Sequence, residues 1–285
     1  YDQPIEQHVL PELLETLEAS SDYRQRRSEI TRFNHSSRVL KRGLALTPVK
    51  FGISFTAKHL NQAGALVHIY TDGSIHVNHG GTEMGQGLYI KVAQVVASAF
   101  QVDLERVKVS ATRTDKVPNT SPTAASSGSD LNGMAALDAC EKILAGLTEF
   151  AAQNWSVSPE TIRFSDNQVQ IGDMEMPWET FVQAAYMNRV PLSSSGFYAT
   201  PKIHYDPKSG TGRPFLYYSN CAACAEVVVD TLTGEYRVLR TDILFDAGRS
   251  LNPDIDIGQI EGGFVQGMGW LTTEELVYSD DGRLL

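Results

Sequence analysis

Apolar residues recur every three to four positions near the start of the chain, which is the spacing of one face of an α-helix. This pattern predicts a helix over residues 5–20 and a second helix over about 22–34. The second segment contains Arg24, Arg26 and Arg27, the main basic cluster of the sequence. Because acidic and polar residues are mixed with them, we interpret these arginines as a solvated helix face rather than a binding patch.

From residue 43 onward the apolar period shortens to two, which indicates β-strands. Alternating runs on either side of Asp72-Gly73 predict a hairpin over 65–78, because the central positions of such a turn favour positive φ angles. A second hairpin is predicted from strands over about 216–230 and 235–245, which are joined by a turn that contains a glycine.

The remaining pattern mixes helices with short strands. Predicted helices cover about 88–99, 130–147, 177–187 and 255–276, and predicted strands cover 106–110, 162–165, 168–171 and 190–200. Asp130 is the candidate N-cap of the second of these helices. We therefore predict an α+β fold of mixed sheets packed with helices, with a helical lead-in over 1–40 and two lobes over 41–205 and 206–285.

The composition is that of an ordinary globular protein, with 42% hydrophobic and 20% charged residues. A net charge of -10 argues against a nucleic-acid surface, which needs clustered basic residues. Cys140, Cys221 and Cys224 are too few for a disulfide framework, so we expect a reducing, cytoplasmic compartment. No apolar run has the length of a membrane span. Because the first residue is not Met and the last follows a turn-like stretch, we expect an interior piece of a longer polypeptide.

The stretch from His79 to Gly87 places four glycines between a predicted strand and a predicted helix. Backbone N–H groups at the start of a helix can bind an anion or a phosphate. The spacing matches neither a Walker loop, which needs Gly-Lys-Ser/Thr, nor the dinucleotide fingerprint, whose third glycine would fall at Ile90. A structural turn and a ligand cradle both stay open. Gln86 favours the cradle, because its amide can donate and accept beside the glycine backbone.

The stretch from Gly258 to Gly269 repeats this chemistry along one predicted helix, with five glycines in twelve residues. A glycine inside a helix costs about 1 kcal/mol relative to Ala. Either close helix packing or the close approach of a large polar cofactor would explain them. Glu83 and Glu261 could form a catalytic carboxylate pair, but a helix cap or a salt bridge is the simpler interpretation of each.

His68 and His76 face each other across the predicted hairpin and His79 follows them, but a solvated sheet face explains all three more simply than a metal site. Cys221 and Cys224 have redox-motif spacing. They lie in a predicted strand, however, so their thiols point to opposite faces of the sheet and we interpret them as buried small residues.

Three segments, in this order, resemble the pterin-binding segments of the molybdenum hydroxylases, the family of xanthine dehydrogenases and aldehyde oxidases. They are Gly80-Gly-Thr-Glu-Met-Gly-Gln-Gly87, Pro118-Asn-Thr-Ser-Pro-Thr-Ala-Ala-Ser126 and Gly258-Gln-Ile-Glu-Gly-Gly-Phe-Val-Gln-Gly267. The resemblance runs from about residue 20 to the end. Phe51-Gly-Ile-Ser-Phe-Thr56 and residues 121–126 are more similar to xanthine dehydrogenases than to aldehyde oxidases, which favours purine substrates.

The resemblance implies that both lobes bind molybdenum held by a pyranopterin. The implied contacts to the pterin and its phosphate come from two glutamine side chains and from backbone groups: Gln86, Gln259, Met84, Gly85, Ser126 and Ser129. Ala125 would lie at the edge of the metal site, and no side chain would bind the metal directly. Gly128 stands where family members often have Ser, so one side-chain contact is in doubt.

The same resemblance implies the substrate contacts. Phe55 would stack on the purine, Thr56 would hydrogen-bond to it, and Leu60 would line the pocket entrance. The family's catalytic base is a Glu in a Gly-Glu-Pro-Pro-like segment, which this sequence lacks, and we expect it beyond residue 285.

The complete enzyme, by resemblance, hydroxylates hypoxanthine and xanthine to urate with water as the oxygen source. Electrons would leave through 2Fe–2S clusters and FAD to NAD, bound by other domains or by another subunit. We expect a dimer, in which this chain joins the remainder of the molybdenum subunit and is inactive alone. The alternative is a non-catalytic module that binds a pterin or a phosphate ligand.

Overall fold

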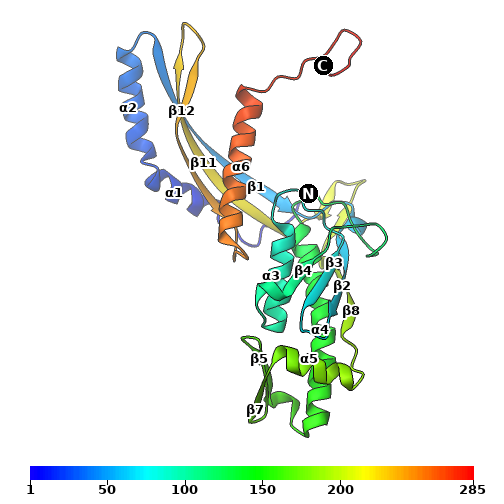
Figure 1. The fold of residues 1–285 in the computed structure, drawn as a ribbon. Helices are drawn as coiled ribbons and strands as arrows, with labels where there is room; N and C mark the ends of the chain where they lie inside the picture. The colour runs from blue at the N-terminus through cyan, green and yellow to red at the C-terminus, as the bar shows by residue number, and fades with distance from the viewer. The chain divides into compact units, whose positions relative to one another are not determined.

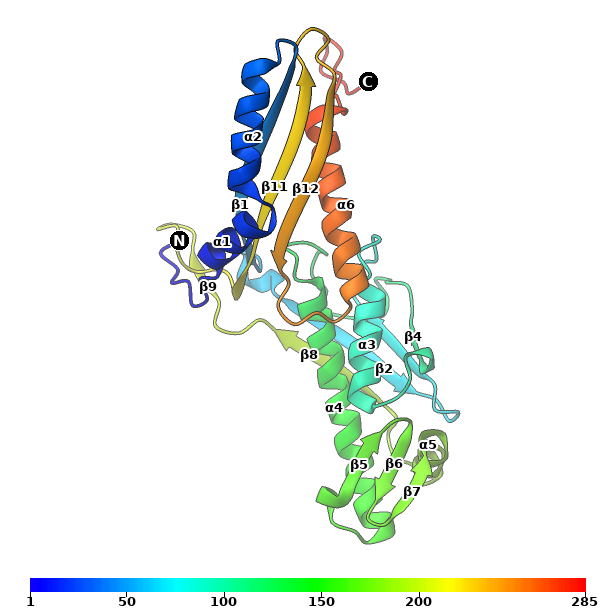
Figure 2. The same ribbon diagram turned by 90° about the vertical axis from the view of Figure 1, so that its left-hand side faces the viewer.

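The computed structural model describes residues 1–285, which divide into two compact units (Figure 1, Figure 2). Unit 1 comprises residues 1–61 and 200–248, and unit 2 comprises residues 62–199 and 249–285. This division differs from the contiguous lobes expected from the sequence. The reason is strand pairing, because a strand near the N-terminus pairs along its whole length with a strand that lies more than 160 residues later.

Unit 1 is built on an antiparallel sheet in the order β1-β11-β12. Its strands are β1 (Leu40–Ile53), β11 (Tyr217–Asp230) and β12 (Tyr236–Asp246). Helices α1 (Leu10–Ser20) and α2 (Tyr23–Ser36) lie along this sheet (Figure 2). Leu17 of α1 is buried with Ala222 and Cys224 of β11, so the predicted lead-in forms one layer of the unit. A short hairpin of β9 (His204–Asp206) and β10 (Thr211–Arg213) completes unit 1.

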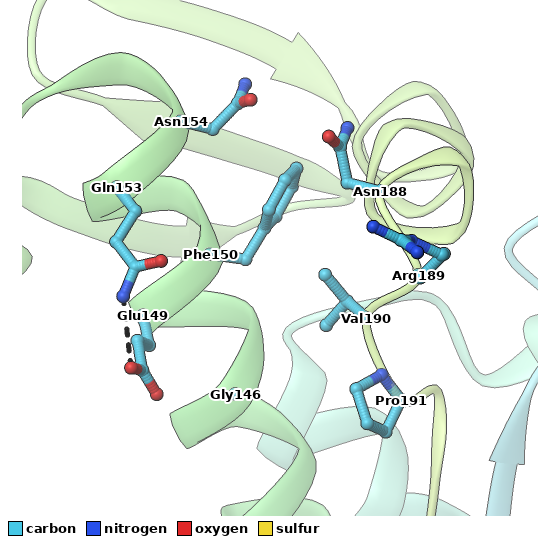
Figure 3. A pocket seen from close by; sticks show the side chains of 9 residues that line it. All are labelled: Gly146, Glu149, Phe150, Gln153, Asn154, Asn188, Arg189, Val190 and Pro191. Carbon is cyan, nitrogen blue, oxygen red and sulfur yellow. Dashed lines mark hydrogen bonds between the residues drawn. The ribbon is translucent and has the colours of Figure 1, made fainter.

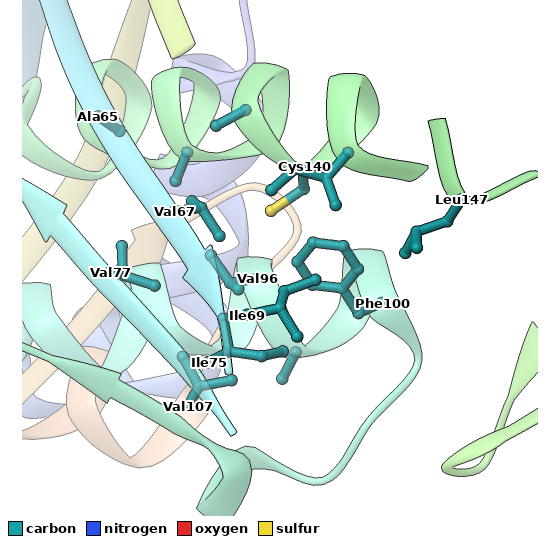
Figure 4. Close-up of a cluster of buried hydrophobic side chains, with 14 of the residues drawn as sticks. Ala65, Val67, Ile69, Ile75, Val77, Val96, Phe100, Val107, Cys140 and Leu147 are labelled. Carbon is teal, nitrogen blue, oxygen red and sulfur yellow. The ribbon is translucent and has the colours of Figure 1, made fainter. Parts of the chain in front are cut away.

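Unit 2 contains a mixed four-stranded sheet in the order β4-β3-β2-β8. Its strands are β2 (Gln62–Ile69), β3 (Ile75–His79), β4 (Val107–Val109) and β8 (Ser193–Ala199). Helices α3 (Leu88–Phe100) and α4 (Gly128–Trp155) supply the other side of the core. Figure 4 shows Val67 and Val77 of the sheet beside Val96 of α3 and Cys140 of α4. The apolar side chains that alternate along β2 and β3 therefore pack against the apolar faces of both helices.

Three further strands and two helices belong to unit 2. They are β5 (Ile162–Ser165), β6 (Gln168–Ile171), β7 (Met174–Pro177), α5 (Trp178–Met187) and α6 (Pro253–Thr272). Single-turn 3-10 helices occur at η1 (Lys58–Leu60), η2 (Leu104–Arg106) and η3 (Pro159–Thr161). No helix in the structure combines the length and the apolar character needed to cross a membrane.

The predicted helices are present, but α4 extends to Trp155 rather than residue 147, and α6 ends at Thr272 rather than residue 276. Two helix starts also differ from the predictions. Helix α1 begins at Leu10 rather than at residue 5, because Pro11 fits the first turn of a helix and not its interior. Helix α4 begins at Gly128 with Ser127 as its N-cap residue, so Asp130 lies inside the first turn and is not the cap.

Both predicted hairpins are confirmed. In the turn between β2 and β3, Gly73 has a φ of 80°, whereas Asp72 does not adopt a positive φ. Asp72 instead accepts hydrogen bonds from the backbone and hydroxyl groups of Ser74. The turn is therefore stabilised by a carboxylate as well as by glycine.

Arg26 is buried, which contradicts the solvated face predicted for it, whereas Arg24 and Arg27 are exposed. Only 8% of Arg26 is accessible to solvent. Its guanidinium nitrogens lie 2.8 Å from a carboxylate oxygen of Glu226 on β11 and 3.0 Å from one of Asp242 on β12. The guanidinium of Arg26, which we predicted to be solvated, therefore attaches α2 to the sheet.

Glu226 is the central acid of this network, because it also pairs with Arg42 on β1. Burial raises the pKa of its carboxyl group, but hydrogen bonds from Arg26 and Arg42 lower it by more, so the pKa lies below the ordinary value for Glu. Three elements of unit 1 thus depend on one buried carboxylate.

We expect Glu226→Gln to lower the free energy of unfolding by about 3–5 kcal/mol, the usual cost of removing one partner from a buried ion pair. The reason is that the buried charge of Arg26 would keep only the carboxylate of Asp242, and Arg42 would lose its pairing with Glu226. Glu18→Gln removes the partner of the exposed Arg24 and should cost less than about 1 kcal/mol. Urea unfolding of the purified proteins measures both. Equal effects would contradict the importance of the buried network.

The same carboxylate gives a dependence of stability on pH. Because the folded pKa of Glu226 lies below its unfolded value, the stabilisation is complete above the unfolded pKa and is lost as the pH falls through the folded pKa. Between about pH 5 and pH 3, the wild-type protein should therefore lose more stability than Glu226→Gln. Parallel losses in the two proteins would show that Glu226 does not titrate as described.

Candidate functional site

The loop between β3 and α3 is organised by its own acidic side chain. The carboxylate of Glu83 accepts hydrogen bonds from the backbone N–H groups of Gly85, Gly87 and Tyr89 at 2.9–3.0 Å. Burial raises the pKa of this carboxyl group, but these backbone donors lower it by more, so the pKa lies below the ordinary value. A negative charge is thus fixed at the positive end of α3. Glu83 is therefore a helix cap, one of the two simpler roles considered from the sequence.

Gln86 closes the solvent side of the same loop. Its amide oxygen accepts a hydrogen bond from the N–H of Met84 at 2.6 Å, and its amide nitrogen donates to the carbonyl of Thr82 at 2.8 Å. The side chain of Met84 remains exposed, and a Cβ at Gly85 would have no neighbour within 4 Å. The loop therefore presents an open surface at Met84 and Gly85, while the N–H groups of both residues are paired within the loop.

Behind the loop, buried side chains hold Gly81. Its N–H lies 3.1 Å from Nδ1 of His79 and 3.1 Å from Oδ1 of Asn132, and its carbonyl accepts the hydroxyl of Thr112 at 2.5 Å. Burial lowers the pKa of His79 to about 4, so the imidazole is neutral and Nδ1 can accept. We predicted that His79 lies on a solvated sheet face, and this is wrong. His79 is the last residue of β3, and only 2% of it is exposed.

The segment that leads into α4 lies beside the loop. The N–H of Thr82 donates to the hydroxyl oxygen of Thr123 at 2.8 Å. Ala125 and Ser126 follow with left-handed φ angles of 55° and 53°. L-residues other than Asn, Asp and Gly rarely adopt this conformation, and each instance costs about 1–3 kcal/mol. Ser126 is exposed, and Ser129 is half-buried in the first turn of α4.

Helix α6 is attached to α3 by its N-terminal turn. Lys91 of α3 pairs with Asp256 of α6 at 2.6 Å. Gly87 lies so close to Ile255 that a Cβ added to the glycine would come within 2.6 Å of the isoleucine side chain. Glycine at this position therefore permits the close approach of the two helices as well as the positive φ of 75°.

This attachment places the amide nitrogen of Gln259 3.4 Å from the carbonyl oxygen of Gly85. The rest of α6 has no buried residue. A Cβ at any of four glycines would meet no atom within 4 Å, namely Gly258, Gly262, Gly263 and Gly267. Helix packing within this chain therefore does not explain these glycines, and they leave open space along the backbone of α6.

Three segments that are far apart in the sequence thus meet at the N-terminal end of α3. The predicted cofactor-contact residues of these segments all lie in unit 2: Met84, Gly85, Gln86, Ala125, Ser126, Ser129 and Gln259. The amide side chains of Gln86 and Gln259 and the glycines of α6, which have open space around them, surround the exposed backbone at Met84 and Gly85. This chemistry fits a large planar ligand with several hydrogen-bonding groups.

Phe55, Thr56 and Leu60 lie in unit 1, directly after β1. Phe55 is half-buried and Thr56 is exposed. Asn61, which is 2% exposed, accepts the N–H of Phe55 at 2.7 Å and donates to its carbonyl at 2.8 Å. Ser54 is also buried and has a φ of 133°, outside the favoured regions. The backbone of Phe55 is thus fixed by an asparagine that the sequence analysis did not single out.

The other candidates do not contribute to this site. His68 and His76 stack across the hairpin with ring centroids 6.1 Å apart. No group of three or more His, Cys, Asp or Glu residues is arranged to hold a metal ion. The two cysteines of β11 are unpaired. The pocket in Figure 3, between α4 and the turn after α5, is lined by residues such as Phe150 and Pro191 and by none of the predicted site residues.

A family model for the molybdopterin cofactor-binding domain matches residues 16–285. The chain belongs to this family. It is 49% identical over 284 residues to the xanthine dehydrogenase/oxidase of Felis catus, and 48% identical over 287 residues to the xanthine dehydrogenase of Dictyostelium discoideum. Each alignment covers 100% of this chain and 20% of the relative, so the chain spans about a fifth of the length of these curated relatives.

The fold is similar to that of quinoline 2-oxidoreductase from Pseudomonas putida 86, with a TM-score of 0.76 at 23% sequence identity. That match covers 97% of this chain and 35% of the other. The α+β fold and the family resemblance predicted from the sequence are therefore confirmed.

We expect Gly87→Ala to destabilise the protein more than Gly85→Ala. Both glycines have positive φ angles, 75° and 96°, so backbone strain should cost about 1–2 kcal/mol at either position. Only at Gly87 would the new methyl group meet Ile255. Adding Ile255→Ala should therefore recover part of the loss caused by Gly87→Ala. Thermal unfolding of wild type, Gly87→Ala, Ile255→Ala and the double variant completes the mutant cycle, with Gly85→Ala as the comparison, and additive effects would contradict the contact.

Proposed function

We propose that unit 2 forms the cradle of a molybdenum-pyranopterin cofactor and that the chain works within a hydroxylase of the xanthine dehydrogenase type. The observation that carries the proposal is the meeting of three distant segments at the N-terminal end of α3. Family membership supports the cofactor, and identity of 48–49% along the whole chain to xanthine dehydrogenases supports the enzyme type.

In this cradle the side chains of Gln86 and Gln259 hydrogen-bond to the pterin through the amide protons and oxygen lone pairs that their bonds to the loop backbone leave unused. Backbone groups complete the contacts: the carbonyl groups of Met84 and Gly85, whose N–H groups are paired within the loop, and the backbone of Ser126 and Ser129. Ala125 would lie at the edge of the metal site, and no side chain of this chain would bind the metal. The open space at Gly85 and along the glycines of α6 admits the ring system. When bound, the cofactor supplies the redox-active metal that takes up the electrons of substrate oxidation.

The cofactor phosphate belongs at α4 rather than at α3 in this proposal. The carboxylate of Glu83 already receives the backbone donors at the start of α3 and would repel a second anion there. The N-cap residue of α4, Ser127, makes no side-chain capping hydrogen bond, so backbone donors beside Ser126 and Ser129 are available to a phosphate. This arrangement also disfavours the alternative of a general phosphate-binding module built on the loop at α3.

For the complete enzyme we propose the oxidative hydroxylation of hypoxanthine and xanthine to urate, with water as the oxygen source. Phe55 stacks on the purine, Thr56 hydrogen-bonds to it, and Leu60 lines the entrance. Offset stacking on an aromatic side chain suits a flat heterocycle. A glutamate outside residues 1–285 acts as the general base.

Electrons leave through 2Fe–2S clusters and FAD to NAD, which other domains or another subunit bind. In this proposal the enzyme is a cytoplasmic dimer. The net charge of -10 of this chain agrees with the absence of nucleic acid among its partners. The share of the relatives that the chain spans leaves room for these further domains.

We expect Phe55→Ala in the complete enzyme to reduce kcat/KM for xanthine by about tenfold or more, the effect of losing an aromatic contact of about 1.4 kcal/mol. Molybdenum content should stay unchanged, because Phe55 lies in the other unit. Phe51→Ala, an exposed phenylalanine on β1, is the matched control and should keep wild-type kinetics. Unchanged xanthine kinetics in Phe55→Ala would refute the stacking role.

We expect Gln259→Leu to lower the pterin and molybdenum content of the purified enzyme about fivefold, since one hydrogen bond contributes about 1 kcal/mol. Gln153→Leu alters an exposed glutamine of α4 that lies outside the three segments and should leave both contents at the wild-type value. Metal analysis and the fluorescence of the oxidised pterin measure the two quantities. Equal contents in all three proteins would remove Gln259 from the cofactor site.

A further inference from the structure

Asn132 connects two segments that the proposed function assigns to the cofactor. It lies one turn into α4 and only 6% of it is exposed. Its Oδ1 accepts the N–H of Gly81 at 3.1 Å, and its Nδ2 donates to the carbonyl of Gly128 at 2.8 Å. A single planar amide therefore connects the glycine loop to the first residue of α4.

The connection depends on close approach of the loop to the helices. A Cβ at Gly81 would lie 2.5 Å from the side chain of Leu88 and 2.6 Å from Nδ2 of Asn132. Glycine is thus required for the backbone N–H to reach the asparagine. His79 shares this N–H through Nδ1, so the hydrogen bond is supported from the strand as well as from the helix.

A second hydrogen bond between the same two segments is weaker because it is exposed to solvent. The N–H of Thr82 donates to the hydroxyl of Thr123, but this pair is exposed, and water can replace either partner. The amide of Asn132 is buried, so water cannot replace it; without this side chain Gly81 would keep only His79 as acceptor and Gly128 would lose the amide donor. The buried link therefore controls the spacing between the two segments.

We propose that Asn132 is a positioning residue for the cofactor. It fixes the glycine loop, with Met84 and Gln86, against the segment that contains Ser126 and Ser129, so that both contact one ligand. Asn132 does not contact the ligand itself, because it lies behind the loop. The inference rests on the proposed function, since it assumes that the two segments bind the same molecule.

The test compares the complete wild-type enzyme with three variants produced in the presence of molybdate. Asn132→Leu removes both hydrogen bonds at similar side-chain volume. Asn132→Asp keeps the acceptor for Gly81 but cannot donate to Gly128. Asn61→Leu is the matched control, because it removes an equally buried asparagine that also bonds to a backbone N–H and a carbonyl, those of Phe55.

Molybdenum is measured by elemental analysis, pterin by its oxidised fluorescent product, and stability by the melting temperature with and without cofactor. Both Asn132 variants should retain cofactor about tenfold less well than wild type, the effect of losing a buried hydrogen bond that links the two segments. The increase in Tm caused by the cofactor should shrink in both. Asn61→Leu should keep the molybdenum and pterin content of wild type and lose purine turnover.

Cofactor retention like that of wild type in either Asn132 variant overturns the positioning role, because the link would then not matter. An equal loss of cofactor in Asn61→Leu also overturns it, since loss of any buried asparagine would have the same effect. Absence of molybdenum and pterin from the wild-type enzyme is a different result, which overturns the proposed function itself.

Discussion

Backbone hydrogen bonding in the loop between β3 and α3 is the constraint on which the site depends. A glycine-rich turn exposes N–H groups, and each needs an acceptor. Glu83 serves three of them, Gln86 serves the N–H of Met84, and His79 and Asn132 share that of Gly81. Side chains of the protein therefore pair these N–H groups and set the shape of the loop.

Because these hydrogen bonds hold the loop in place, the other two segments of the site pack beside it in defined positions. Helix α6 is attached to it through Gly87 and Ile255, where the absence of a Cβ permits contact. The left-handed pair Ala125 and Ser126 holds its strained conformation beside the same loop. Strain of this kind persists only where the surroundings impose it, and here a packed core of two helices and a sheet lies directly behind.

A buried asparagine appears in each unit in a comparable role. Asn61 bonds to the N–H and the carbonyl of one residue, Phe55, and Asn132 bonds to the N–H of one segment and the carbonyl of another. An amide is suited to this role because it donates and accepts in one plane without carrying a charge that burial would destabilise. In both places the asparagine fixes backbone next to a residue of the candidate site.

The sequence by itself determined the local elements and the family. Apolar period and turn chemistry located both hairpins and the helices, because these depend on neighbours within a few residues. The three glycine- and serine-rich segments revealed the family, since their residue order is specific.

Tertiary structure decided the features that do not depend on neighbouring residues in the sequence. Arg26 is buried because Glu226, 200 residues later, offers it a carboxylate. The division into two units follows from pairing of β1 with β11. Asn132 and Asn61 look like ordinary polar residues until folding brings a backbone donor and acceptor to each. Long-range pairing and burial set these outcomes, and neither is encoded in the spacing of adjacent residues.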